Sequence, residues 1–286
     1  MRRPPLLCLL LTIAASPALA KDRRPSLEVR PGAAKPGDLL MLTVADAKAR
    51  PSGTAAGRQL YFFPSADGFR ALVPLPVEIP PGELSLQVFL PAASEKDGAV
   101  TFDANVEVID PAFPARTLTV DRKFTDPPPA VKKWMADDRK AFAQVFSRPA
   151  EPPRFNGPFA WPRTAVVTAP FGDRRVFNGK QQSQHYGVDL DGVVGAPVNA
   201  SNDGEVVMVR DCYGSGQTVV IHHGAELYTL YFHLSEFAVK PGDRVKRGER
   251  VGKVGMSGRV TGPHLHWAVK VAGLYVNGES LLSLPF

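Results

Sequence analysis

The sequence predicts a mainly β protein with an N-terminal antiparallel β-sandwich-like domain, a short helical linker and a C-terminal antiparallel β-sheet domain. Three observations predict this class. Short segments alternate apolar and polar residues, which is the period of half-buried strands. The 28 prolines and 25 glycines separate these segments as turns. A chain of 286 residues is long enough for two domains, each with its own core.

Residues 1–20 have the features of a secretory signal peptide. Two arginines precede an apolar run, and Ala18-Leu19-Ala20 forms an A-x-A cleavage site. The run is shorter than the ~20 apolar residues that span a bilayer, so we expect export without a stable transmembrane anchor; an uncleaved anchor is the alternative. The periplasm is the expected compartment.

Residues 21–123 predict a β-sandwich-like accessory domain. Seven alternating segments, among them LLMLTVA (39–45), ELSLQVFL (83–90) and RTLTV (116–120), are separated by turn sequences such as PPGE and EKDG. This part contains no histidine. We therefore expect it to position or bind rather than to catalyse.

Residues 124–152 predict a helical linker. Thr125 or Asp126 could cap a helix that prolines open, and Pro149 would end it. An apolar stripe at helical spacing is expected to pack on one domain or both: Val131, Trp134, Met135, Phe142, Val145 and Phe146.

Residues 153–286 return to strand patterns and contain all six histidines. Turns are expected at Asp203-Gly204, Pro241-Gly242-Asp243 and Gly262-Pro263. Signal-peptide cleavage would lower the net charge from +6 to +4, and the basic residues are dispersed. This balance suits an anionic partner such as a cell wall and argues against nucleic acid. Cys212 would be the only cysteine left, so no internal disulfide is expected.

The spacing of the histidines predicts a metal site. On a strand, residues i, i+2 and i+4 face the same side, so His264 and His266 converge, as do His185 and Asp189. Two opposed faces of this kind could hold two imidazoles and one carboxylate around one ion. Three N/O ligands with an open position are typical of catalytic zinc. His233, which ends the strand LYTLYFH, would stand nearby.

These motifs together resemble the M23 family of zinc metallopeptidases, the lysostaphin-type or LytM-like peptidoglycan endopeptidases. The resemblance covers about residues 157–286 and includes HYGVD, LYTLYFHL, GRVTGPHLHW, APFGDRR and VKPGDRVKRGERVGKVG. It implies one Zn²⁺ held by His185, Asp189 and His266. It also implies that His233 and His264 are the catalytic pair.

The resemblance implies hydrolysis of peptide bonds in peptidoglycan crosslinks or stem peptides. Water would attack a peptide carbonyl, with one catalytic histidine taking the proton and the other stabilising charge or protonating the leaving amine. A groove for an extended peptide could be lined by aromatic residues, for which core packing is the other interpretation: Phe171, Tyr186, Tyr231 and Trp267.

Some positions depart from the pattern or fall outside it. Phe177 stands where some family members place a tyrosine hydroxyl, which leaves the oxyanion donor open. Asn178 is a candidate for the asparagine that blocks zinc in latent members. His222 and His223 follow a strand into a turn, where a structural role is expected.

Two other functions compete with the peptidase. A degenerate relative would bind the wall and activate another hydrolase, but all five key positions are intact here. The stretch VKPGDRVKRGERVGKVG also resembles part of a biotinyl or lipoyl carrier domain, yet no lysine stands at a hairpin tip as that function needs.

Overall fold

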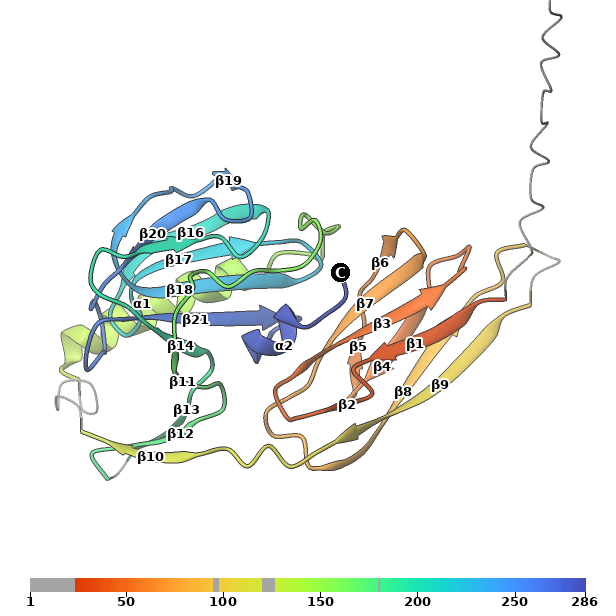
Figure 1. The fold of residues 1–286 in the computed structure, drawn as a ribbon, viewed down its shortest axis with the longest axis horizontal. Coiled ribbons are helices and arrows are strands. Elements are labelled where there is room, and N and C mark those ends of the chain that lie inside the picture. Colours follow the sequence, from red (N-terminus) through yellow and green to blue (C-terminus); the bar gives the residue numbers. More distant parts are fainter. Residues whose placement is uncertain (1–23, 95–97, 120–126, 180) are drawn as a thin grey trace, which may run out of the picture.

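The computed structural model describes residues 24–94, 98–119, 127–179 and 181–286. The predicted signal peptide and the proposed caps Thr125 and Asp126 lie outside these residues. The described chain is mainly β, as predicted, and forms two lobes with one long helix (Figure 1). No helix among the described residues is long and apolar enough to cross a membrane.

The N-terminal lobe consists of two sheets. The first has the order β1-β3-β7-β6 and the second β2-β9-β8-β4-β5. Pairing is antiparallel except between β2 and β9, which are parallel. The strands are β1 (Ser26–Arg30), β2 (Ala33–Ala34), β3 (Leu39–Ala45), β4 (Ser52–Ala55), β5 (Arg58–Gln59), β6 (Phe62–Ser65), β7 (Gly68–Pro74), β8 (Gly82–Leu90) and β9 (Val100–Val108).

The alternation of side chains explains how these two sheets pack. On β8, Leu86, Val88 and Leu90 are buried while the residues between them are exposed. They share one core with Leu40, Leu42 and Val44 of β3 and with Val106 and Val108 of β9. The period of two therefore gives each sheet one apolar face, as in a sandwich.

The C-terminal lobe is built on a ten-stranded sheet. Its main path is β11-β14-β21-β18-β17-β16-β19, with β15, β20 and β22 attached at the side. The strands are β11 (Val167–Ala169), β14 (Val188–Asp191), β15 (Pro197–Asn199), β16 (Gly204–Cys212), β17 (Gly216–His222), β18 (Leu227–Phe237), β19 (Arg244–Val245), β20 (Arg250–Val254), β21 (His264–Val271) and β22 (Leu274–Val276).

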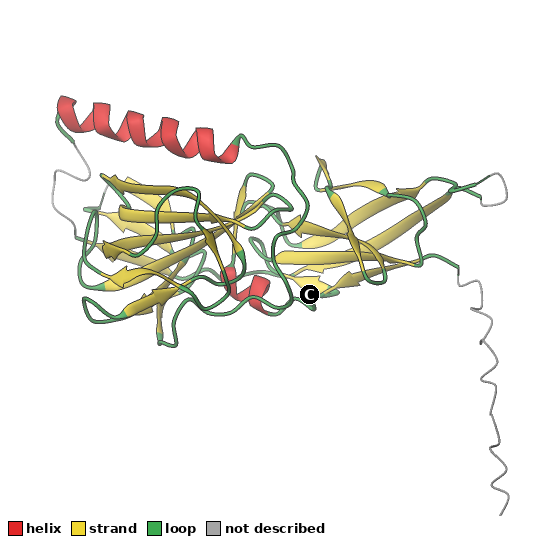
Figure 2. Ribbon diagram, turned by 90° about the horizontal axis from the view of Figure 1, so that it is seen from above, coloured by secondary structure: helices red, strands yellow, loops and turns green. Residues whose placement is uncertain are grey.

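The linker contains the helix α1 (Pro129–Phe146), which lies across one face of this sheet (Figure 2). Phe142, Val145 and Phe146 pack against Tyr228 and Leu230 of β18. The C-terminal end of the predicted stripe thus meets the sheet. Trp134, near the other end, is 40 % exposed and contacts Tyr213 edge to face.

The two lobes share part of a core. Leu39, Met41 and Leu72, on the second face of β3 and β7, belong to the same buried cluster as the C-terminal sheet. The short helix α2 (Gly278–Leu282) follows β22 and lies between the lobes (Figure 1). The Ser280 hydroxyl accepts a hydrogen bond from the Leu39 amide at 2.9 Å.

One predicted strand pairs elsewhere than expected. The sequence assigned residues 116–120 to the accessory domain, but β10 (Ala115–Leu118) runs parallel to β12 (Arg174–Phe177). With β13 (Gln181–Gln184) these strands form a separate three-stranded sheet. The pairing begins with a hydrogen bond from the Arg174 backbone amide to the Pro114 carbonyl. The segment that leaves the first lobe thus becomes a wall of the site described next.

Candidate metal centre

Two neighbouring strands bring the predicted metal ligands together. In the antiparallel ladder of β14 and β21, Asp189 lies directly opposite His266, and Asp191 lies opposite His264. His264 and His266 share one face of β21, as their spacing predicts. His185 lies in the segment that enters β14, four residues before Asp189.

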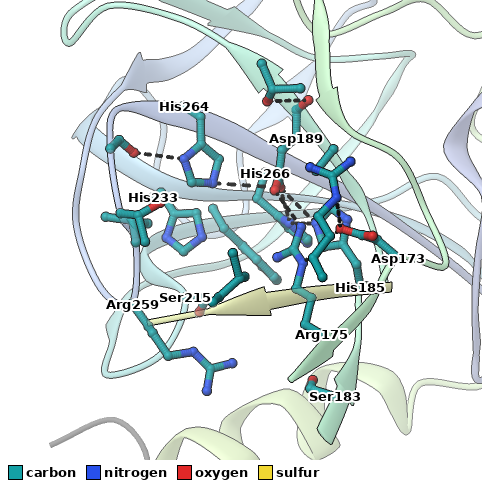
Figure 3. A pocket seen from close by; sticks show the side chains of 18 of the residues that line it. Asp173, Arg175, Ser183, His185, Asp189, Ser215, His233, Arg259, His264 and His266 are labelled. Atoms are coloured by element: carbon teal, nitrogen blue, oxygen red, sulfur yellow. Dashed lines mark hydrogen bonds and ion pairs between the residues drawn. The ribbon is translucent and has the colours of Figure 1, made fainter. Parts of the chain in front are cut away.

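Three ligand atoms meet at one point of this face (Figure 3). His185 Nε2 lies 2.9 Å from Asp189 Oδ1 and 2.9 Å from His266 Nδ1. His266 Nδ1 lies 2.8 Å from the same carboxylate oxygen. His185 and Asp189 are buried, and His266 is partly buried.

The protons available at this point are too few for hydrogen bonds alone. His185 Nδ1 lies 2.7 Å from the Pro170 carbonyl, which can only accept, so in the neutral ring Nδ1 carries the proton and Nε2 offers a lone pair. The carboxylate also offers only lone pairs. A proton on His266 Nδ1 is then the only one available for the three short contacts among His185 Nε2, Asp189 Oδ1 and His266 Nδ1. A divalent cation satisfies such a cluster, and two imidazoles with one carboxylate suit zinc. The residues present therefore fit a zinc ion.

An ion-pair network supports the carboxylate ligand. Arg175 Nη2 binds Asp189 Oδ2 at 2.9 Å, and its Nε lies 3.5 Å from Asp173 Oδ2. Arg116 of β10 reaches the fully buried Asp173 at 3.1 Å. Burial would raise the pKa of Asp189, but its close contacts with His185 and His266 outweigh burial and hold this pKa well below its usual range. Asp189 is therefore a carboxylate at neutral pH.

Two further histidines stand beside the centre with a common arrangement. His233 Nδ1 donates to the Ser257 carbonyl at 2.8 Å, and His264 Nδ1 donates to the Gly262 carbonyl at 2.9 Å. In the neutral form of either ring, Nε2 is therefore the acceptor. The two ring centroids lie 5.0 Å apart, and His264 Nε2 lies 3.7 Å from Asp189 Oδ1. The His264 acceptor is thus close to Asp189, and the His233 ring centroid lies 6.0 Å from that of His266.

His233 has an unusual backbone conformation. Its φ is +61°, in the left-handed region that residues other than glycine seldom adopt. The ladder between β17 and β18 shifts register at this position, and the His233 amide instead donates to the Ser215 carbonyl. Burial lowers the pKa of His233 to about 3, with His266 and His264 acting in the same direction. The ring is therefore neutral at pH 7.

A pocket of about 550 Å³ opens over the centre. His185, Asp189, His233, His264 and His266 all line it, from three separate stretches of chain. Its other walls come from β10, β12 and the loop between β20 and β21. A groove with bases beside a metal centre can bind and hydrolyse a polar substrate.

Of the four aromatic residues predicted to line the groove, only Tyr186 does so. It is 38 % exposed and stacks on Tyr275. Phe171, Tyr231 and Trp267 belong instead to the buried core that the C-terminal sheet shares with the first lobe. Tyr231 is fully buried, and its hydroxyl bonds to Ser201 and Thr229.

The remaining predicted positions have structural surroundings. His223 is buried, with ring nitrogens 2.7 Å from the Asp203 carbonyl and from the Thr229 hydroxyl. His222 is buried and stacks on Tyr228. Cys212 is a buried free thiol. Asn178 does not line the pocket as the structure describes it.

The charged residues of the pocket that were missed from the sequence include Arg116, Asp173, Arg175 and Arg259. Asp173 and Arg175 lie in APFGDRR, a stretch already noted for its resemblance, which was the available signal. Arg259 lies in GRVTGPHLHW, which is also part of the resemblance but in which only the two histidines were interpreted as functional. Nothing in the sequence around Arg116 indicates a place in the pocket, because that place depends on the unexpected pairing of β10 with β12.

Comparison with known proteins agrees with the geometry. Residues 183–278 match the model of Peptidase family M23. The chain is 45 % identical over 112 residues to the peptidoglycan DD-endopeptidase ShyA of Vibrio cholerae, covering 39 % of this chain and 26 % of that protein. It is 40 % identical over 119 residues to the DD-carboxypeptidase/endopeptidase Mpg of Neisseria meningitidis, covering 42 % of this chain and 27 % of the relative.

The chain thus spans about a quarter of the length of these relatives. A solved structure from Pseudomonas aeruginosa, described as an M23 peptidase, has the same fold with a TM-score of 0.65. It is 24 % identical, and the match covers 86 % of this chain and 94 % of that one. From the site geometry and these matches together, residues 183–278 form a domain of Peptidase family M23.

Proposed function

We propose that this protein is a zinc-dependent endopeptidase that hydrolyses peptide bonds in peptidoglycan crosslinks or stem peptides. The observation that carries the proposal is the convergence of His185, Asp189 and His266 beside two histidines with free Nε2 atoms. The names of the curated relatives supply the substrate class.

The proposed ligands are His185, Asp189 and His266. A zinc ion bound there would lower the pKa of a water molecule to about 7 and polarise a peptide carbonyl. His185 and Asp189 are pre-positioned by the Pro170 carbonyl and by Arg175, which reduces the reorganisation needed for binding.

The proposed catalytic pair is His264 and His233. Each presents a lone pair on Nε2, so either ring can take a proton from the attacking water. Once protonated, that Nε2 becomes a donor and can stabilise the oxyanion or protonate the leaving amine. His264 is the closer of the two to Asp189, and we assign it the first proton transfer.

The test separates metal binding from catalysis. Purified sacculi are digested with the mature protein, the products are identified by mass, and zinc content is measured for each variant. His185→Ala should lose zinc and activity together, whereas His264→Ala should keep zinc and lose activity. Val193→Ala, at a 76 % exposed side chain, is the control. Normal cleavage by His264→Ala would refute its assigned role.

A non-catalytic wall-binding protein that activates another hydrolase is the competing function. It is not favoured, because the five side chains of the centre are present and close together. Zinc-loaded protein that leaves sacculi intact would favour it. We further propose that the protein is exported, most consistently to the periplasm, and that residues 1–20 are removed.

A further inference from the structure

Arg259 differs from the other two arginines of the pocket in having no acidic partner within the described part of the chain. Arg116 pairs with Asp173, and Arg175 pairs with Asp173 and Asp189. No carboxylate among the described residues forms an ion pair with the Arg259 guanidinium. Figure 3 shows Arg259 on the His233 side of the pocket and both aspartates on the other side.

The position of Arg259 is well defined. Its backbone amide donates to the Gly214 carbonyl at 2.8 Å, and its guanidinium carbon lies 4.9 Å from the centre of the Phe177 ring. Such a contact orients a guanidinium without neutralising it. A Cβ on the neighbouring Gly258 would lie 2.4 Å from the Gly216 backbone nitrogen, which shows how closely this loop packs.

The same loop holds the proposed catalytic pair. Ser257 and Gly262, on either side of Arg259, supply the carbonyls that bind His233 and His264. The distance between the guanidinium and the two bases is therefore set within one short segment. A group bound by Arg259 would have a defined position relative to the bond that these histidines attack.

The electrostatics of this position favour an anion. Burial lowers the pKa of Arg259, and the nearby positive charge of Arg175 lowers it further, while Tyr213 offsets part of the change. A guanidinium remains charged in spite of such a shift. Arg259 is a partly buried cation near a second cation, and the described residues supply no carboxylate to pair with it. A ligand carboxylate that forms an ion pair with Arg259 would therefore stabilise this charge. The planar fork of arginine matches a carboxylate with two parallel hydrogen bonds.

We propose that Arg259 is a specificity residue that binds a free carboxylate of the peptide substrate beside the scissile bond. The inference rests on the proposed peptidase function and narrows its substrate class. Crosslinked peptides with a free carboxylate next to the cleaved bond should be preferred over the same peptides with that group amidated. Charge-assisted recognition of this kind corresponds to about a 10- to 100-fold difference in kcat/KM.

The test compares two synthetic crosslinked peptides, one with the free carboxylate and one with the carboxamide. The zinc-loaded full chain should prefer the acid mainly through KM. Arg259→Gln should cleave both peptides at similar rates, and Arg259→Lys should retain part of the preference. Arg250→Gln, which removes an exposed arginine outside the pocket, should keep it in full. Equal losses on both peptides, or an unchanged preference, in Arg259→Gln would overturn the proposal.

A binding measurement separates this inference from the proposed function. The His264→Ala protein is titrated with each peptide in a calorimeter, with and without Arg259→Gln. Tighter binding of the acid that depends on Arg259 supports the carboxylate site even if the wild type cleaves neither peptide. Cleavage by the wild type with no preference for the acid would refute the carboxylate site and leave the peptidase intact.

Discussion

Replacing Gly187 with alanine should disturb the metal centre through a single methyl group. A Cβ at this position would lie 2.4 Å from His266 Nε2, 2.6 Å from its Cε1 and 2.8 Å from the Trp267 carbonyl oxygen. Ordinary contacts begin at about 3.4 Å. The carbonyl belongs to the β14–β21 ladder and cannot retreat without breaking it. The imidazole must therefore give way by about 1 Å.

The expected magnitudes follow from this displacement. Overpacking of a well-packed site costs about 1–3 kcal/mol of stability. A metal ligand moved by this distance should weaken zinc binding by at least the 10- to 100-fold that loss of an outer-shell partner typically causes. Zinc affinity is measured by competition with a chromophoric chelator, and stability by urea unfolding of the metal-free protein.

Gly262→Ala is the matched control. Gly262 lines the pocket, but nothing lies within 4 Å of a Cβ built there. It should therefore bind zinc as the wild type does. If Gly187→Ala did the same, the His266 ring could not be confined as described, and its assignment as a ligand would be in doubt.

Two further predictions concern buried side chains outside the centre. Tyr231→Phe should lower the free energy of unfolding in urea by about 1–3 kcal/mol, because the Ser201 amide loses its buried acceptor. Its kcat/KM on peptidoglycan fragments should stay unchanged. A large fall in kcat/KM with normal stability would instead make Tyr231 a substrate-binding residue. Burial lowers the pKa of His222 to about 4, so between pH 6.5 and 4 only the unfolded chain takes up this proton and stability falls as pH falls. His222→Phe should reduce that loss by roughly 1–2 kcal/mol at pH 5, and an unchanged pH profile in urea unfolding would contradict it.

The sequence was informative wherever a period of two decides the outcome. His264 and His266 share a face because they stand two residues apart on β21, and the ladder with β14 then places Asp189 opposite His266. The same alternation predicted the sandwich-like first lobe. The resemblance of the motifs identified which five side chains belong together before any distance was known.

The missed features depend on contacts between distant segments. The sequence of β10 reads like any other strand, and nothing in it selects β12 as its partner. Arg116 reaches Asp173 only through that pairing, so the link from the first lobe to the metal ligands stayed hidden. For Tyr231, an aromatic residue on a strand suits a groove or a core, and only the side of the sheet on which it lies decides.

The proposed roles of the four histidines of the centre depend on backbone carbonyls, which no motif encodes. His266 stands opposite Asp189 in the ladder, close to the shared point, and reaches it with Nδ1, the ring nitrogen nearer the main chain. His185 enters from farther away and uses Nε2, because the Pro170 carbonyl holds its Nδ1 proton.

Hydrogen bonds to backbone carbonyls also fix the ring protons of His233 and His264, for which we propose a catalytic role. Ser257 and Gly262 bind the Nδ1 protons of His233 and His264, which leaves the Nε2 lone pairs of these two pocket-lining rings to accept a proton. Those carbonyls belong to the loop that also carries Arg259. The chemistry of the proposed bases and the position of the proposed carboxylate site therefore depend on one segment between β20 and β21. A change in the path of that loop should alter proton transfer and substrate preference together, while the metal ligands on β14 and β21 stay in place.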